Sequence, residues 1–177
     1  MKGGSREDFS ETSSPLPQSS GSKFSYDEIL SKLKGYSMNS RNKALEDLIR
    51  HLIDQPIEAI TAELSKPRSK FKQIVSLFVE RFKKKEDHSS FKCVEVQLDC
   101  LEYFLSTIPE NLLEDIGPIC LALINCSLQT KPVIADKAKE ILAFIKEILT
   151  ADLVLPLLIV AIDNEKTHVS DAVKVLN

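Results

Sequence analysis

Apolar residues recur along this chain every three or four positions, in segments separated by short polar stretches. The clearest segment has its apolar positions at Phe71, Ile74, Val75, Phe78, Val79 and Phe82. This spacing places the apolar side chains on one face of a helix and leaves the opposite face polar. Strand-like alternation of apolar and polar residues is hard to find. The pattern therefore predicts an all-α protein with no sheet.

Residues that favour helix ends bound these segments. A short helix is predicted to open at Ser25 and end at Gly35, and Ser40 is predicted to cap the next helix. Further helices are expected over 56–64, 71–82, 90–107, 109–124 and 131–148. The helix that starts at 109 contains Gly117 and Pro118, which we expect to kink it or delay its start.

The segment from 131 to 177 predicts a helix, a tight turn, a buried helix, a polar tip and a third helix. Thr150 is expected to cap the second helix, Pro156 to delay or kink it, and Asp163–Asn164 to break it. Neither helix of such a pair buries its apolar face alone, so the next pair must stack on it. Comparable helices begin near residues 40, 90, 131 and 166, at intervals of about 40 residues, which is typical of HEAT or armadillo repeats. We therefore expect an armadillo-like HEAT-repeat solenoid of about three and a half helix pairs.

Composition divides the chain into a leader and one domain. Residues 1–24 are rich in Ser, Gly and Pro and hold too little apolar surface to offset the entropy lost on ordering, so we expect a disordered leader. Residues 25–177 are expected to form the solenoid and to be cut from a longer array. The net charge of −3 gives no reason to expect a nucleic-acid partner. The longest apolar run, 153–162, is too short to cross a bilayer, so no membrane partner is expected.

The sequence offers no cluster of catalytic or metal-binding residues. The four cysteines, which lie in apolar helical patterns without C-x-x-C spacing and are expected to be reduced core residues of an intracellular protein, are Cys93, Cys100, Cys120 and Cys126. His51 follows Asp47 by one helical turn, which predicts a solvated ion pair rather than an acid–base dyad. His88 and His168 fall on predicted tips far apart in sequence. With no Gly-rich phosphate loop or hydrolase motif either, we expect no enzyme, no cofactor and no metal site.

Basic residues recur at or near the predicted tips between helices. They are Arg41, Lys83, Lys84, Lys85, Lys92, Lys131, Lys137 and Lys166. The simpler interpretation of any one of them is that it solvates a helix end or complements the helix dipole. Together they predict a discontinuous positive strip that suits an acidic partner surface.

Three stretches of the chain resemble the TOG domains of the microtubule polymerase and CLASP families: M-N-S-R-N-K-A-L-E-D-L at 38–48, T-K-P-V-I-A-D-K-A-K-E-I-L at 130–142, and A-I-D-N-E-K-T-H-V at 161–169. The likeness covers roughly residues 26–177, most of a domain that has six HEAT repeats in those families. Arg41 matches an arginine of the family's first helix, and Met38 stands where the family has a Trp that contacts tubulin. Basic residues at the third and fourth tips of the family match Lys131 and Lys166.

The resemblance implies a binding module rather than an enzyme. TOG tips dock on the acidic surface of the αβ-tubulin dimer, and arrays of such domains act on microtubule ends by multivalency. The implied partner-binding residues are Met38, Arg41, Lys85, Lys92, Lys131 and Lys166. The resemblance also implies a cytoplasmic protein of the cytoskeleton, with this chain a monomeric fragment of a longer multi-domain protein.

Two alternatives remain open at this stage. One is a HEAT or armadillo scaffold that binds another protein on its concave helix face, as transport receptors, phosphatase scaffolds and ciliary adaptors do. The other is a TOG-like domain that packs against its own neighbours. Charge reversal at the tips separates the first alternative from tubulin binding, because a ligand on a concave face does not depend on the tips.

Overall fold

The computed structural model describes residues 24–84, 88 and 90–176, with side chains described as far as residue 164. Over this part of the chain the structure is helical and contains no β-strand, which confirms the predicted all-α class. The elements in chain order are α1 (Tyr26–Lys34), α2 (Met38–Ile53), α3 (Ile57–Leu64), α4 (Lys70–Lys84), α5 (Phe91–Thr107), the 3₁₀ helix η1 (Pro109–Asp115), α6 (Ile116–Ser127), α7 (Pro132–Ile148) and α8 (Ala151–Leu176). The leader prediction falls on residues outside this description, apart from Phe24.

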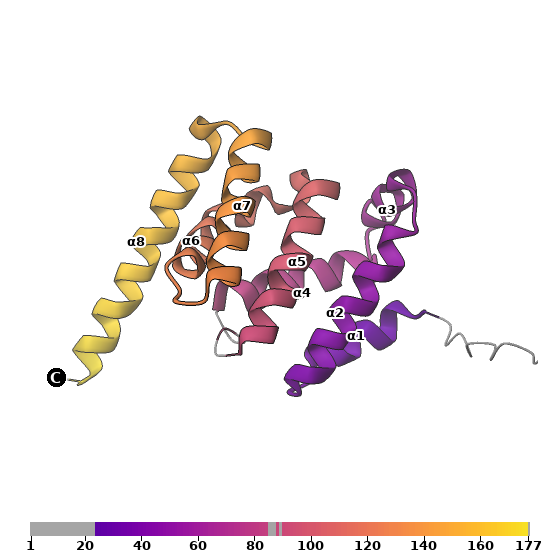
Figure 1. The fold of residues 1–177 in the computed structure, drawn as a ribbon, viewed down its shortest axis with the longest axis horizontal. Coiled ribbons are helices and arrows are strands. Elements are labelled where there is room, and N and C mark those ends of the chain that lie inside the picture. Colours follow the sequence, from indigo (N-terminus) through magenta and orange to yellow (C-terminus); the bar gives the residue numbers. More distant parts are fainter. Residues whose placement is uncertain (1–23, 85–87, 89, 177) are drawn as a thin grey trace, which may run out of the picture.

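The helices stand in two rows (Figure 1). Helix α4 contacts α1 and α6, and α6 contacts α8, so these four form one row. In the second row α5 lies between α2 and α7. Helices α2, α5 and α7 run in the same direction, with their N-terminal ends toward the lower edge of the view in Figure 1. One edge of the molecule is therefore built from three helix N-termini.

The core lies between the rows and is centred on aromatic side chains of α4 and α5. Every apolar position of the predicted stripe in α4 is buried. The Phe104 ring of α5 lies 6.1 Å from the ring of Phe71 and 5.6 Å from that of Phe78, measured between centroids. These separations are within the range of favourable aromatic pairs, so the stripe of α4 is buried by specific packing with α5.

The start of α2 differs from the prediction. Ser37, rather than Ser40, is the N-cap residue, and its hydroxyl accepts a hydrogen bond of 3.3 Å from the Ser40 backbone N–H. Both serines carry a hydroxyl that can satisfy a free N–H of the first turn. The earlier serine takes this position because Gly35 has already ended α1, as predicted, and the chain turns within 35–37. Met38 thereby becomes the first residue of α2.

The predicted irregularity at Gly117–Pro118 is a late start of an α-helix. The chain from Pro109 forms η1, and α6 begins at Ile116. Gly117 is buried against α8, where a Cβ atom would lie 2.1 Å from the carbonyl oxygen of Leu157. The glycine is therefore required for the close approach of α6 and α8.

The predicted break at Asp163–Asn164 is wrong. Helix α8 runs without interruption through both residues to Leu176, with Pro156 inside it. Asp and Asn have modest helix propensity but leave the backbone hydrogen bonds intact, and neither Gly nor Pro follows them in the chain. The third helix expected near 166 is therefore the second half of α8. Within the described residues, no helix has both the length and the apolar content needed to cross a membrane.

Candidate functional site

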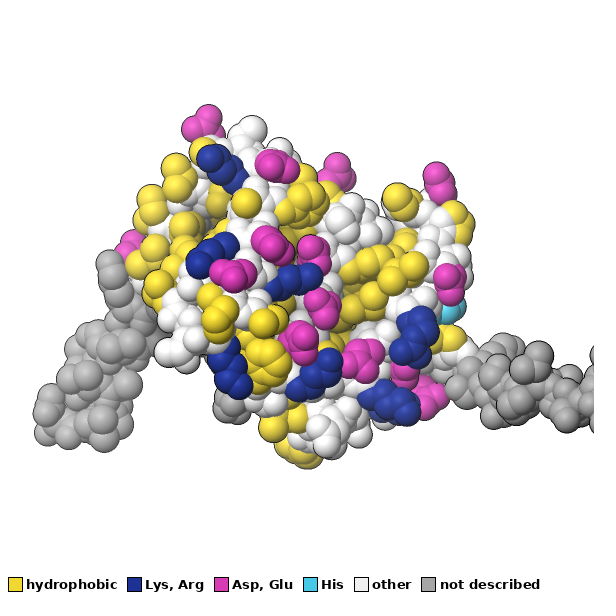
Figure 2. Space-filling model, viewed as in Figure 1, with side chains coloured by type: hydrophobic (Ala, Val, Ile, Leu, Met, Phe, Trp, Pro, Cys, Tyr) yellow, Lys and Arg dark blue, Asp and Glu magenta, His cyan; other side chains and the backbone are white. Residues whose placement is uncertain are grey.

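Exposed apolar side chains gather at the N-terminal ends of α2, α5 and α7. Tyr36 is 100% exposed and Leu128 is 78% exposed. Figure 2 shows hydrophobic and basic side chains along this lower edge of the molecule, with acidic side chains among them. The residues that form this surface, called here the tip edge, are Tyr36, Met38, Phe91, Lys92, Leu128, Lys131 and Val133.

A second set of exposed apolar side chains lies on α8, where Leu153, Leu155, Ile159 and Val160 are 40–57% exposed. The prediction that this helix is buried is therefore wrong on that side, because α8 is the last helix of its row and packs on α6.

Met38 connects the tip at the start of α2 (the first tip) with the tip at the start of α5 (the second tip). Its sulfur lies 3.6 Å from the Cys93 sulfur on α5, and the Asn42 side-chain amide donates a 3.2 Å hydrogen bond to the same sulfur. Cys93 is buried, whereas Met38 is 39% exposed. A thioether adapts its shape to irregular apolar surfaces, so Met38 offers a contact surface that is fixed on one side and free on the other.

Lys131 connects the second tip with the tip at the start of α7 (the third tip). Its ammonium group lies 4.5 Å from the centroid of the Phe91 ring, a cation–π contact. Phe91 is the first residue of α5, and Lys131 is the N-cap residue of α7. A contact of this kind contributes about 0.5–1 kcal/mol at exposed sites and holds the positive charge beside an apolar ring. The tip edge thus carries exposed apolar side chains at each tip, and one of its two lysines is held against an aromatic ring.

Lys92 forms ion pairs with carboxylates of the same chain. Its ammonium lies 3.3 Å from a Glu95 carboxylate oxygen and 3.6 Å from one of Glu46 on α2. The hydrogen bond from Lys92 to Glu95, together with the charge of Glu95, raises the pKa of Lys92. Its positive charge is therefore partly neutralised before any partner arrives.

Arg41 lies beneath the tip edge rather than on it. The residue is only 7% exposed, and its guanidinium donates a 2.9 Å hydrogen bond to the Gly35 carbonyl. This bond ties the first turn of α2 to the end of α1. The structure thus brings Met38, Lys92 and Lys131 to one edge and places Arg41 in a supporting position.

The two remaining predicted residues are not placed on the edge. Lys85 lies outside the described residues. The backbone of Lys166 lies inside α8 rather than at an inter-helix tip, because the predicted break before it does not occur. Its side chain belongs to the part of α8 that is not described.

Sequence reasoning missed most of the apolar residues of this edge. Tyr36, Phe91 and Leu128 each fall next to a helix end and outside the periodic stripe of the neighbouring helix. This position is the sequence signal for an exposed apolar side chain, because an apolar residue outside the stripe does not lie on the buried face of its helix. It becomes informative only when several tips are known to share one edge.

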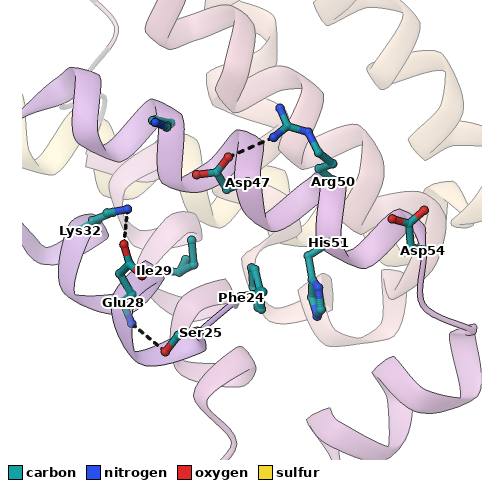
Figure 3. A pocket seen from close by; sticks show the side chains of 10 residues that line it. Phe24, Ser25, Glu28, Ile29, Lys32, Asp47, Arg50, His51 and Asp54 are labelled. Atoms are coloured by element: carbon teal, nitrogen blue, oxygen red, sulfur yellow. Dashed lines mark hydrogen bonds and ion pairs between the residues drawn. The ribbon is translucent and has the colours of Figure 1, made fainter. Parts of the chain in front are cut away.

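A separate groove lies between α1 and α2 (Figure 3), with a volume of about 600 Å³. It is lined by three acidic and three basic side chains, among which Lys32 pairs with Glu28 at 2.6 Å and Arg50 with Asp47 at 3.3 Å. The His51 ring stacks on Phe24 at 3.7 Å between centroids, in place of the predicted ion pair with Asp47. The groove therefore presents balanced charge and no single class of ligand is favoured by it.

The thiols and other potential ligands do not form a reactive centre in the described part of the chain. Cys93, Cys100, Cys120 and Cys126 are buried free cysteines, which agrees with the prediction that they belong to the core. Burial raises the pKa of the Cys120 thiol to about 11 and that of Cys100 well above its usual range. Among the described residues, no three His, Cys, Asp or Glu side chains are grouped so that they could hold a metal ion.

Comparisons of the chain with protein-family models, with curated proteins and with solved structures give no match.

Proposed function

We propose that this chain is a non-catalytic HEAT-type solenoid of the TOG kind, which docks on the acidic surface of the αβ-tubulin dimer through its tip edge. The two-row arrangement of helices supports the solenoid, since each helix of a row packs on the one before it. The resemblance of 38–48 and 130–142 to TOG sequences supports the choice of tubulin. The proposed location is the cytoplasm, on the cytoskeleton.

The observation that carries the proposal is the alignment of three tips on one edge, each with an exposed apolar side chain. The first tip supplies Tyr36 and Met38, the second Phe91, and the third Leu128 with Lys131. Apolar anchors surrounded by charge are typical of protein interfaces, because burial of the anchors gives affinity while the charges set orientation. Tyr36 and Met38 together take the place of the family Trp.

The electrostatic contribution comes mainly from the third tip. Lys131 contacts an aromatic ring rather than a carboxylate, so its full charge faces a partner. Lys92 shares its charge with Glu46 and Glu95. One domain with this limited charge is expected to bind tubulin weakly, and linked domains gain affinity through effective concentration. Binding should therefore weaken as salt increases.

The test measures co-migration of the chain with αβ-tubulin by gel filtration with light scattering, at low and at physiological salt. The variants are Lys131→Glu and Phe91→Ala on the tip edge. The matched control is Lys146→Glu, because Lys146 is exposed in the last turn of the same helix α7. Arg41 is left unchanged, since its substitution would disturb the fold.

Loss of binding by about tenfold or more in the tip-edge variants, with Lys146→Glu unchanged, is the expected result. Equal binding by all variants would contradict the tip edge as the docking surface. No binding by the unmodified chain, even at low salt, would contradict tubulin as the partner of this chain.

A further inference from the structure

A second surface lies on the outer face of the α2–α5–α7 row, away from the tip edge. A groove of about 460 Å³ crosses the C-terminal halves of these helices. Its lining residues, which define what we call the row groove, are Ile49 of α2, Asp99, Glu102, Tyr103 and Ser106 of α5, and Phe144 of α7. The volume is within the range of about 300–1,000 Å³ that is typical of ligand-binding sites.

The floor of the row groove is apolar. Ile49, Tyr103 and Phe144 are partly buried and pack against the core, and each leaves a portion of its side chain open to the groove. Ile53, one turn further along α2, is 64% exposed and extends the apolar strip. Figure 2 shows hydrophobic side chains gathered between α5 and the α2–α3 pair, beside acidic ones. A long apolar side chain fits this floor.

The rim of the row groove carries an excess of carboxylates. Lys137 of α7 lies 3.2 Å from Asp99 and 2.5 Å from Glu102, so one ammonium serves two carboxylates. Burial works to lower the pKa of Lys137, but its hydrogen bonds to Glu102 and Asp99 leave that pKa raised. The side chain of Asp99 nevertheless remains 51% exposed, with acceptor positions open to a further donor.

The excess extends along the whole face of α5. Glu95, Asp99 and Glu102 recur at helical spacing on one side of this helix. At the row groove itself, the carboxylates of Asp99 and Glu102 share the single ammonium group of Lys137, which leaves a net charge of −1. This balance disfavours phosphate groups of nucleic acids or anionic lipids and favours a basic group.

We propose that the row groove binds a segment of a partner protein in which an aromatic or long aliphatic side chain stands next to an Arg or Lys. The apolar side chain occupies the floor between Ile49, Tyr103 and Phe144. The basic group reaches Asp99, where an arginine can form two parallel hydrogen bonds with the carboxylate. The proposal is independent of tubulin docking, because the row groove and the tip edge have no residue in common.

The test begins with a selection from a library of random 12-residue peptides displayed on phage. The full chain is the bait, and the Asp99→Lys variant is used for counter-selection. Enriched sequences should place an aromatic or aliphatic residue beside Arg or Lys. Enrichment of acidic motifs, or no enrichment beyond the counter-selected pool, would overturn the proposal.

The best peptide is then labelled and titrated by fluorescence anisotropy. Asp99→Lys and Phe144→Ala should each weaken its binding by about tenfold. The matched control is Glu110→Lys, which reverses an exposed charge on η1 that does not line the row groove. Circular dichroism of each variant shows whether the fold is kept, and equal binding by folded Asp99→Lys and the unmodified chain would refute the assignment.

The same variants separate the other possible occupants. If light scattering shows a concentration-dependent dimer that Asp99→Lys abolishes, a second copy of the chain fills the row groove and the proposed partner segment is wrong. If Asp99→Lys removes tubulin binding as well, the independence of the two surfaces is wrong. The proposed assignment requires a monomer in the first measurement and unchanged tubulin binding in the second.

Discussion

Replacement of Gly117 by Ala tests the contact on which the end of the fold depends. The added Cβ would lie 2.1 Å from the Leu157 carbonyl oxygen and 3.1 Å from the Leu158 backbone nitrogen. Both atoms belong to the backbone of α8, so no side chain can rotate away to make room. Restoring ordinary contact at 3.4 Å requires α6 and α8 to separate by about 1.3 Å at this point.

The size of the effect follows from two opposing contributions. Overpacking of a well-packed site costs about 1–3 kcal/mol, and the rigid backbone neighbours place this site near the upper end of that range. A gap of about 0.5–1 Å already forfeits a quarter to a half of each dispersion contact along the helix pair. Ala gains up to about 1 kcal/mol over Gly in helix propensity. The net loss should be about 2 kcal/mol, or about 4–8 °C in Tm for a domain of this size.

The measurement is thermal and urea unfolding, followed by circular dichroism. Gly35→Ala is the matched control, because Gly35 has a φ of −71°, which any residue adopts, and its added Cβ would lie 3.2 Å from the Lys32 carbonyl oxygen, so a shift of about 0.2 Å restores ordinary contact. This control should change Tm little. An unchanged or raised Tm for Gly117→Ala would refute the close approach of α6 and α8.

Three further predictions concern the buried Arg41 and the buried thiols. Arg41→Ala removes the hydrogen bond to the Gly35 carbonyl and should lower the free energy of unfolding, measured in urea, by about 1–3 kcal/mol. The control Arg68→Ala, at an exposed residue, should lower it little. Equal urea midpoints for the two variants would show that Arg41 is not a supporting residue. At pH 8 the thiols should react with a disulfide reagent far more slowly in the folded chain than in denaturant, since the pKa of Cys120 is raised to about 11 and only about a thousandth of it is thiolate. Because the unfolded chain releases these thiol protons at lower pH than the folded chain, stability should fall as pH rises from about 9 to 11, and rapid reaction of the native thiols would contradict their burial.

The local structure of most helices could be predicted from the sequence because it depends on spacing within one segment. The stripe in α4, the limits of α1 and the start of α7 at Pro132 needed only helical periodicity and end preferences. The break expected at Asp163–Asn164 was wrong because that prediction, too, used only the preferences of residues within one segment. A weak local preference for a turn does not end a helix when the hydrogen-bonded ladder can continue.

The role of individual basic residues could not be predicted in this way. Arg41 and Lys131 are similar in sequence terms, since each is a basic residue near the start of an amphipathic helix. The structure buries the first against the Gly35 carbonyl and places the second over the exposed ring of Phe91. Burial and pairing depend on residues from other helices, which periodicity along one helix does not contain.

By itself, the sequence determined that the chain is all-α, where most of its helices lie and which face of α4 and of α5 is buried. Only the tertiary structure decided that α2, α5 and α7 place their N-terminal ends on one edge, and that Ile49, Tyr103 and Phe144 meet in one groove. The physical reason is the range of the interactions. Helix formation and amphipathicity arise from residues three and four positions apart, whereas both candidate surfaces arise from packing between helices tens of residues apart in the chain.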